Sequence, residues 1–235
     1  MLRRAGISVA VNTEGANLLA GVAVTLIGAA SWSGRFHAEY LILETDERFL
    51  PIISKQLPPA WLCVTNIQKD QVQRNGEPDI IYRKISESLR RNTVLFLNND
   101  EPRSLSLAAQ VDKSIFFGVE QNNKSFVKRG FFTTTMSCPA CGAPIRFYRY
   151  NIDNVGAFAC SRCELSSSVS PTYLARHIDF DAGTFSVDGF SYRLPYGAPY
   201  FLYCYIAAIA IAREIGVRPE FCAAALAEFI NVGGR

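Results

Sequence analysis

The chain has 235 residues, of which 49% are hydrophobic and 19% charged, enough apolar material for one domain with an insertion or for two small domains. The net charge is +3 and the basic residues are scattered, with Arg90-Arg91 and Lys128-Arg129 as the densest pairs, which argues against a nucleic-acid-binding stripe. No secretory signal follows Met1, and the apolar stretch 16–30 is short for a bilayer span. We therefore expect a cytoplasmic chain without a transmembrane segment.

The first 120 residues alternate short apolar, β-branched runs with longer amphipathic ones. Strands are predicted at residues 7–11, 40–44, 61–66, 93–98 and 114–119, and helices at residues 14–30, 46–55, 78–91 and 103–110. Near-continuous apolar strands separated by helices indicate an α/β domain with a parallel sheet covered on both faces. Because ligands bind such sheets at the carboxyl ends of the strands, Glu44, Asn66 and Asn98 fall where a ligand would lie.

The pattern changes at residue 131. Short runs rich in turn residues, at 145–150, 157–159, 177–180 and 184–194, predict small β elements, with hairpin turns at residues 181–183 and 188–189. A helix is predicted at residues 200–215, ended by Gly216, and another begins near Pro219. We assign residues 1–130 to the first part of a central domain, 131–175 to an insertion, and 176–235 to the return of the central domain.

Four of the seven cysteines form two Cys-x-x-Cys pairs. They are Cys138, Cys141, Cys160 and Cys163, and eighteen residues separate the pairs. Four thiolates complete a tetrahedral shell with no open position, so the spacing predicts a structural zinc site in preference to two disulfides or a redox pair. Iron is the main chemical alternative, because it also suits four sulfur ligands. Cys63, Cys204 and Cys222 stand singly in apolar runs and are expected to be small core residues.

Polar clusters follow the first strands. In residues 43–47 (LETDE), Thr45 or Asp46 could simply cap the next helix, whereas Glu44 could be a magnesium ligand at a nucleotide site. Residues 65–71 (TNIQKDQ) could be a polar loop, and residues 97–102 (LNNDEP) a turn with helix-start chemistry. No phosphate-loop sequence G-x-x-x-x-G-K-[ST] and no G-x-G-x-x-G sequence occurs. On these residues alone, the prediction stops at an α/β domain with a zinc insertion.

Taken together, several segments carry a family resemblance. They are residues 12–18 (NTEGANL), 43–47 (LETDE), 65–71 (TNIQKDQ) continuing to 74–77 (RNGE), 97–102 (LNNDEP) and the four-cysteine insertion. In order and spacing, over nearly the whole chain, they resemble the MurT family, the Mur-ligase-like subunits of lipid II isoglutaminyl synthase. The resemblance implies a Mur-ligase-type central domain, with a mainly parallel sheet flanked by helices and a small β zinc ribbon inserted.

The resemblance also implies an activity. Members amidate the α-carboxyl of D-glutamate in the lipid II stem peptide, giving D-isoglutamine in peptidoglycan synthesis. ATP activates the carboxylate as an acyl phosphate, and a partner glutaminase of the GatD type supplies ammonia. Glu44 is then the implied magnesium ligand, and Asn66, Asp70 and Gln71 line the same ATP and Mg²⁺ region. Phosphoryl transfer depends mostly on positioning and charge neutralisation, which suits carboxylate and amide oxygens around magnesium.

The sequence departs from the family pattern in several places. The family's glycine-rich phosphate loop would precede Met1, and its third domain, which carries the proposed catalytic aspartate, would follow Arg235. The helix near adenine usually contributes asparagines, where this chain has Phe201 and Cys204; Gln73 and Asn75 replace an aspartate and a tyrosine. We therefore expect a fragment or a divergent homologue that alone binds ATP very weakly and amidates nothing.

Two other classes of function compete with the ligase subunit. The first is a non-catalytic scaffold or binding module that kept the Mur-type sheet and the zinc ribbon. The second is a zinc-ribbon nucleic-acid binder, supported only by Arg146, Tyr148, Arg149 and Tyr150 near the cysteines. A solvated strand face explains those residues equally well, so we expect no nucleic-acid partner.

Overall fold

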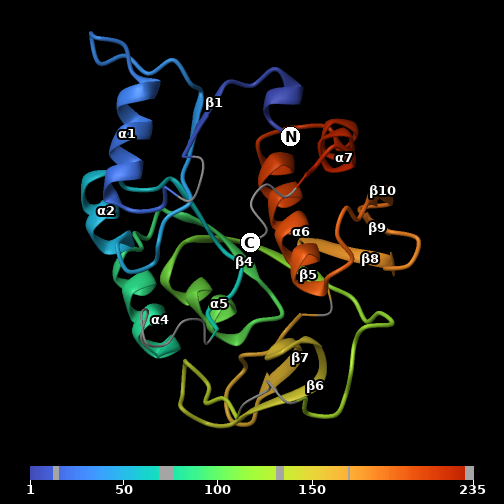
Figure 1. The fold of residues 1–235 in the computed structure, drawn as a ribbon. Coiled ribbons are helices and arrows are strands. Elements are labelled where there is room, and N and C mark those ends of the chain that lie inside the picture. The colour runs from blue at the N-terminus through green and yellow to red at the C-terminus, as the bar shows by residue number, and fades with distance from the viewer. Residues whose placement is uncertain (13–15, 69–76, 131–134, 169, 231–235) are drawn as a thin grey trace. The chain divides into compact units, whose positions relative to one another are not determined.

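The computed structural model describes residues 1–12, 16–68, 77–130, 135–168 and 170–230. The chain divides into two compact units. The first comprises Met1–Pro59 and Lys69–Leu89, and the second comprises Ala60–Gln68 and Arg90–Arg235. Figure 1 labels the helices and strands of both units. No helix in the described part of the chain is long and apolar enough to cross a bilayer.

The first unit is built around a two-stranded parallel sheet. Its elements are the 3-10 helix η1 (Arg3–Ala5), β1 (Val9–Val11), α1 (Leu19–Ala29), β2 (Tyr40–Ile42), α2 (Leu50–Gln56) and α4 (Pro78–Glu87). β1 pairs with β2 in register, Val9 opposite Tyr40, while α1 packs on β1 and α2 packs on α4. The predicted strands and helices are all present, although part of the predicted start of α1 lies outside the described residues. α2 begins at Leu50 rather than residue 46, because the Asp46 carboxylate accepts hydrogen bonds from Arg48 in a turn before the helix.

The second unit contains a six-stranded mixed sheet with the order β10-β9-β8-β5-β4-β3. Its strands are β3 (Trp61–Val64), β4 (Val94–Asn98), β5 (Lys113–Val119), β8 (Tyr173–Asp179), β9 (Thr184–Val187) and β10 (Phe190–Arg193). Neighbouring strands from β3 to β8 are parallel, and β9 and β10 continue the sheet antiparallel. Asp188 and Gly189 both have positive φ, so the predicted β9–β10 turn is of the hairpin type that suits twisted strands.

The centre of this sheet is buried on both faces. Leu95, Phe96 and Leu97 of β4 are fully buried although their side chains alternate between the two faces. The covering helices are α5 (Pro102–Ser106), the 3-10 helix η2 (Leu107–Gln110), α6 (Pro199–Glu214) and α7 (Pro219–Ala227). α5 and α6 both contact β4, and α7 contacts β10. α6 ends at Glu214, and Gly216, two residues further on, adopts a left-handed φ of 96°, consistent with its predicted role in ending the helix.

The cysteine segment forms a hairpin of its own, with β6 (Ile145–Ile152) antiparallel to β7 (Val155–Cys160). The observed sheets differ from the predicted organisation in two respects. β1 and β2 form a separate two-stranded sheet, so the strand sequence does not build one sheet. In addition, β8 starts at Tyr173 and pairs in parallel with β5, so the main sheet is resumed just before the predicted insertion boundary at residue 175. The assignment of residues 131–175 as a separate insertion stays a prediction.

Candidate metal centre and strand-end site

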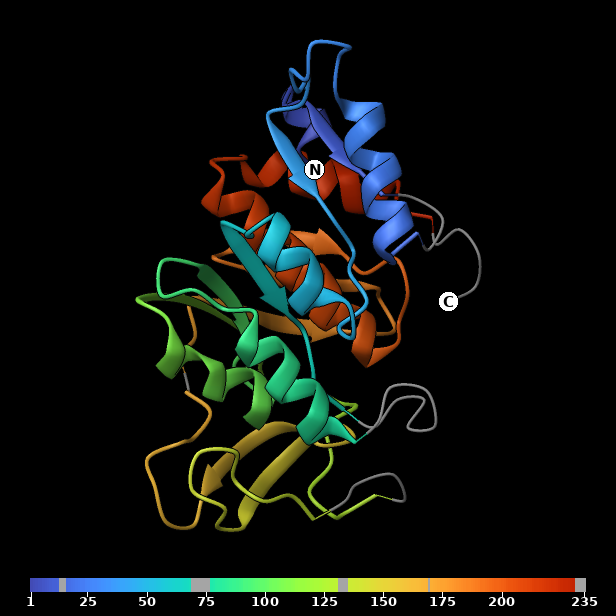
Figure 2. The same ribbon diagram turned by 90° about the vertical axis from the view of Figure 1, so that its left-hand side faces the viewer.

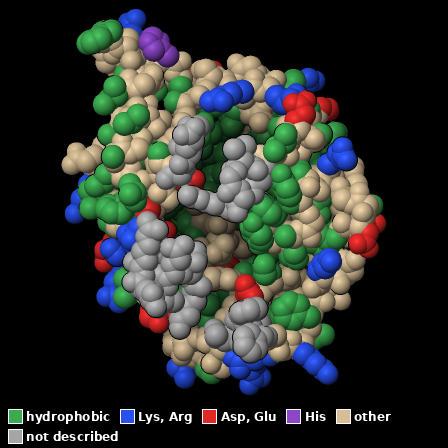
Figure 3. Space-filling view, in the orientation of Figure 1, with side chains coloured by type: hydrophobic (Ala, Val, Ile, Leu, Met, Phe, Trp, Pro, Cys, Tyr) green, Lys and Arg blue, Asp and Glu red, His purple; other side chains and the backbone are tan. Residues whose placement is uncertain are grey.

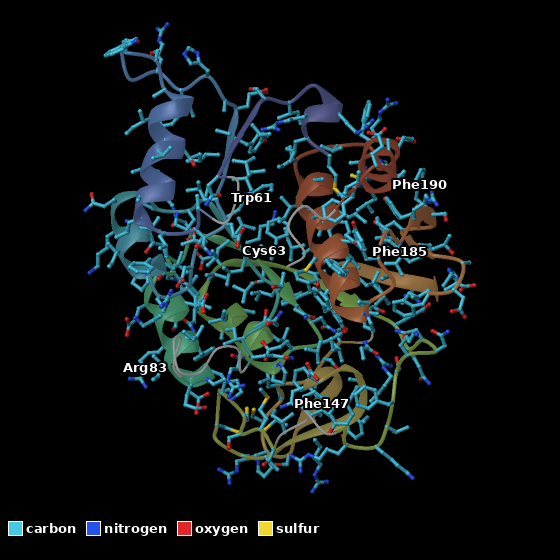
Figure 4. All side chains as sticks on the ribbon, viewed as in Figure 1. Trp61, Cys63, Arg83, Phe147, Phe185 and Phe190 are labelled. Carbon is cyan, nitrogen blue, oxygen red and sulfur yellow. The ribbon has the colours of Figure 1, made fainter. Side chains whose placement is uncertain are left out.

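The four predicted zinc ligands come together in the second unit. The sulfur atoms of Cys138, Cys141, Cys160 and Cys163 all lie within 4.8 Å of one another, with 3.6 Å between Cys138 and Cys163 and 3.5 Å between Cys141 and Cys160. Figure 4 shows sulfur atoms clustered beside the β6–β7 hairpin, on which Phe147 lies. The prediction that these four cysteines converge is confirmed.

Each cysteine pair lies on a tight turn. In the first turn the Gly142 N–H donates to the Cys138 carbonyl at 2.8 Å, and Gly142 adopts φ 75°, a conformation that glycine reaches without a steric cost. In the second turn the N–H groups of Arg162 and Cys163 donate to the Cys160 sulfur at 3.3 and 3.4 Å. The backbone N–H of Cys163, followed by that of Arg162, lowers the pKa of the Cys160 thiol to about 6, whereas burial raises the pKa of the Cys138 thiol. Cys160 is therefore the one of these two thiols that ionises more readily.

The geometry fits a closed four-sulfur site. A tetrahedral ion with Zn–S bonds of about 2.3 Å separates its ligand sulfurs by about 3.8 Å, close to the observed spacing. The four cysteines are unbridged, since a disulfide would bring two sulfurs to about 2.05 Å. A four-cysteine cluster of this kind fits zinc, and iron shares the same geometry.

A buried polar network joins the hairpin to the sheet. The Asp100 carboxylate, just beyond β4, accepts hydrogen bonds from Tyr203 Oη at 2.8 Å and from the Val119 N–H at 2.9 Å. Tyr203 Oη in turn accepts from Asn151 Nδ2 of β6 at 2.9 Å. The Asp100 carbonyl accepts from the Gly156 N–H of β7 at 2.8 Å. Asp100 beyond β4, Val119 of β5, Tyr203 of α6 and the hairpin thus share one set of hydrogen bonds.

Asp100, which belongs to this network, lies in a polar cluster that is visible in the sequence. Residues 98–101 are four consecutive polar residues, directly after an apolar strand, and all four are less than 5% exposed. The turn and helix-start reading is confirmed for Glu101, whose carboxylate accepts the N–H groups of Arg103 and Ser104 at the start of α5. The side chain of Asn98 is also hydrogen-bonded to the backbone: its Nδ2 donates to the Thr65 carbonyl, and its Oδ1 accepts from the Asp100 N–H. Nothing in the sequence singled out Asn151 and Tyr203.

The residues predicted to hold ATP and magnesium fall in both units. Glu44 belongs to the first unit and Asn66 to the second, and both side chains are exposed. Within the described residues neither side chain has a hydrogen-bond partner, so their oxygens remain available to a ligand. Asp70 and Gln71 lie outside the described residues. The Glu44, Asn66, Asp70 and Gln71 site therefore stays a prediction.

The start of α6 carries an aromatic cluster. Phe201 stacks on Tyr200 with ring centroids 4.2 Å apart and lies parallel to Tyr205 at 6.0 Å. Phe201 is half-buried within this cluster. The expectation that Cys204 is a core residue is wrong, because its position on α6 leaves it exposed. This part of α6 therefore offers aromatic rings, rather than amide groups, to its surroundings.

Comparisons with known proteins place this geometry in context. No protein-family model matches the chain. It is 28% identical to the MurT subunit of lipid II isoglutaminyl synthase (glutamine-hydrolyzing) from Streptococcus pneumoniae over 87% of its length, and 24% identical to that of Staphylococcus aureus over 93%. The chain is similar to MurT. It spans about half of these MurT subunits, 46% and 49% of their respective lengths.

Solved structures agree with this MurT likeness at the level of the fold. A pseudomurein peptide ligase type C from Methanothermus fervidus matches the whole chain with a TM-score of 0.78 at 20% identity, over 46% of its own length. MurF from Acinetobacter baumannii matches 97% of the chain with a TM-score of 0.64 at 14% identity, over 42% of its own length. The MurT-like chain therefore has a Mur-ligase-type fold, a mixed sheet flanked by helices with a cysteine cluster.

Proposed function

We propose that this chain is the Mur-ligase-like part of an ATP-dependent amidoligase that acts in peptidoglycan synthesis. The observation that carries the proposal is the continuous similarity to MurT subunits over 87–93% of the chain, on a Mur-ligase-type fold. The substrate is the D-glutamate α-carboxyl of the lipid II stem peptide, and the product is D-isoglutamine. A GatD-type glutaminase is the proposed partner, and lipid II is met at the membrane surface.

The proposed reaction has two balanced steps. First, a substrate carboxylate oxygen attacks the γ-phosphorus of ATP, which forms an acyl phosphate and releases ADP. Ammonia then attacks the acyl carbon, the bond to the phosphate oxygen breaks, and the proton lost by the nitrogen passes to the phosphate, so that the amide and hydrogen phosphate are released. Hydrolysis of glutamine by the partner would supply the ammonia. Most of the catalysis in such a phosphoryl transfer is positioning and charge neutralisation.

The residues proposed for nucleotide binding are Glu44, Asn66, Asp70 and Gln71. The exposed carboxylate of Glu44 and the exposed amide of Asn66 offer the hard oxygen ligands that Mg²⁺ prefers. When bound, Mg²⁺ supplies charge neutralisation to the phosphate oxygens. The cysteine cluster has a separate, structural role, because four thiolates leave a metal ion no open coordination position.

The test is amidation of purified lipid II, followed by mass spectrometry of the released stem peptide. Because residues 1–235 contain no phosphate-loop sequence, we expect the chain alone to bind MgATP weakly and to leave lipid II unamidated. The assay therefore uses the protein as its gene encodes it, with either ammonium or glutamine plus a GatD-type partner. We expect ATP-dependent exchange of the carboxyl for an amide, reduced at least tenfold by Glu44→Ala but not by the control Glu47→Ala.

Three outcomes separate the parts of the proposal. Activity with ammonium but not with glutamine would reject the proposed glutaminase partner and support the proposed ligase activity. Equal activity in Glu44→Ala and the parent would reject the magnesium assignment. No ATP-dependent amidation of lipid II under either nitrogen source would reject the ligase and favour a scaffold with a Mur-type fold.

A further inference from the structure

Within the described part of the first unit, helix α1 presents an apolar surface that is largely exposed. Residues 16–34 contain no charged side chain, and Val22 is the one buried residue of α1. Leu19, Val24 and Ile27 are 41, 69 and 74% exposed. Because side chains three positions apart share one side of a helix, Val24 and Ile27 form one exposed apolar strip. Eleven residues are too few to span a bilayer, so any contact of α1 with a bilayer would lie along its surface.

The turn after α1 extends this strip with an exposed aromatic side chain. Ala30 and Phe36 form an antiparallel bridge, and the Ser31 N–H donates to the Arg35 carbonyl at 2.8 Å, so residues 31–35 form a closed tip. Trp32 on this tip is fully exposed and Phe36 is 53% exposed. Figure 3 shows hydrophobic, basic and histidine side chains together at the corner where the tip lies. Trp is the side chain most suited to the boundary between water and lipid.

The charge around the strip is positive. Arg35 lies on the tip itself, and Arg3 and Arg4 of η1 are also exposed; both elements lie towards the same end of the first unit (Figures 1 and 2). Among the described residues before Glu44, Glu39 is the one acidic residue, and its carboxylate accepts hydrogen bonds from the N–H and hydroxyl of Ser8. The end of the unit that carries Trp32 is thus complementary to an anionic surface.

We propose that α1 and residues 30–36 dock the first unit onto the surface of an anionic lipid bilayer. The choice of a bilayer rests on the proposed function, whose substrate is membrane-bound. Val24, Ile27, Trp32 and Phe36 enter the boundary between headgroups and acyl chains, while arginines contact lipid phosphates. Two weak signals, apolar insertion and electrostatic attraction, together give reversible membrane binding. Docking in this way brings the unit to the layer where lipid II carries its stem peptide.

The test follows Trp32 directly. The chain has two tryptophans, so a Trp61→Phe variant leaves Trp32 as the sole indole reporter. Vesicles of phosphatidylcholine, alone or with phosphatidylglycerol, are added at two salt concentrations. With the mixed vesicles at low salt we expect a blue shift of Trp32 emission and quenching by brominated lipid. In flotation assays of the otherwise unmodified chain, Trp32→Ala and Arg35→Glu should each weaken binding about tenfold, equivalent to about 1.4 kcal/mol.

Tyr148→Ala is the matched control, because Tyr148 is an equally aromatic side chain, 63% exposed, on the hairpin of the other unit. It should leave vesicle binding unchanged. Binding that is equal for neutral and anionic vesicles, or that survives Trp32→Ala, would overturn the proposal. A dimer in solution that Ile27→Asp dissociates would overturn it too, and would assign the strip to a second copy of the chain. Vesicle binding requires neither ATP nor amidation, so its failure is distinct from failure of the ligase function.

Discussion

The side-chain amide of Asn12 hydrogen-bonds both backbone polar groups of Glu44. The Glu44 N–H donates to Asn12 Oδ1 at 2.8 Å, and Asn12 Nδ2 donates to the Glu44 carbonyl at 2.7 Å. Asn12 is 6% exposed and lies directly beyond β1, while Glu44 lies shortly after β2. A side chain thus continues the pairing of the two strands past their ends. The backbone of Glu44 is held while its carboxylate remains exposed.

Asn12→Ala should therefore destabilise the first unit, whereas Glu44→Ala should not. Asn12→Ala leaves the N–H and carbonyl of Glu44 without their side-chain partner, and we expect it to lower the free energy of unfolding by about 1–3 kcal/mol. Removal of the exposed Glu44 carboxylate should change the free energy of unfolding by less than about 0.5 kcal/mol. Urea unfolding of both variants measures the difference. Equal stabilities would show that the Asn12 bonds contribute nothing net.

The purified chain should contain one zinc ion per molecule when prepared anaerobically. Cys141→Ser should lose most of the metal, because three thiolates no longer complete the tetrahedral shell. Cys204→Ser is the control, since Cys204 is exposed and lies on α6, away from the cluster. Elemental analysis of the two variants measures the number of zinc ions per chain. One iron ion per chain in place of zinc would identify iron as the bound metal.

Metal removal should loosen the hairpin while the main sheet persists. The sheet has its own fully buried side chains, including Phe96, Phe117 and Phe185, whereas the hairpin has only a small apolar interior. Hydrogen exchange after chelation should therefore accelerate in β6 and β7 and remain slow in β4 and β5. Uniform acceleration across the second unit would show that the metal stabilises the whole unit.

Burial of Glu101 predicts a pH dependence of stability. Desolvation raises the pKa of the Glu101 carboxyl to about 7, against the opposing hydrogen bonds from the Ser104 and Arg103 N–H groups. The folded state therefore binds a proton that the unfolded state has lost, between about pH 4.5 and pH 7. The protonated Glu101 carboxyl therefore contributes fully to the free energy of unfolding below about pH 4.5. This contribution, about 3 kcal/mol at most, is lost as the pH rises from about 4.5 through the folded-state pKa of about 7.

Glu101→Gln should remove that part of the pH dependence. Burial also raises the pKa of Asp100, so both carboxyls act in the same direction, and only the difference between parent and variant isolates Glu101. Chemical unfolding at pH 5 and pH 8 measures it. A parent and a Glu101→Gln variant with parallel stability profiles would contradict the assignment.

Two glycines of α1 should respond oppositely to alanine. A Cβ on Gly21 would lie 2.1 Å from the Ala16 carbonyl oxygen, so the backbone must shift and Gly21→Ala should destabilise the unit. A Cβ on Gly28 meets no heavy atom within 4 Å. Gly28→Ala should therefore be neutral or stabilising, by up to about 1 kcal/mol from helix propensity. Thermal unfolding of the pair tests the packing of α1 against the segment before it.

Structure could be predicted from the sequence where local chemistry determines it. Most positions in runs such as residues 93–98 are apolar, which a strand covered on both faces explains, and the cysteine spacing fixed the metal cluster. Structure could not be predicted where it depends on contacts between residues that are far apart in the sequence. β8 follows the cysteine segment in sequence yet pairs with β5, and no local pattern reports that partner. Asn151 and Tyr203 likewise acquire their roles only through a contact between β6 and α6.

The parallel pairing of β5 with β8 has a kinetic consequence. Phe117 lies opposite Tyr173, and the whole cysteine hairpin is contained in the loop between these strands. Closing a long loop before its contacts form slows folding, and the entropic cost rises with the length of free chain. A metal ion bound by the four cysteines would close the hairpin and so shorten that free chain. Refolding of the six-stranded sheet is therefore expected to be faster with zinc present than after chelation.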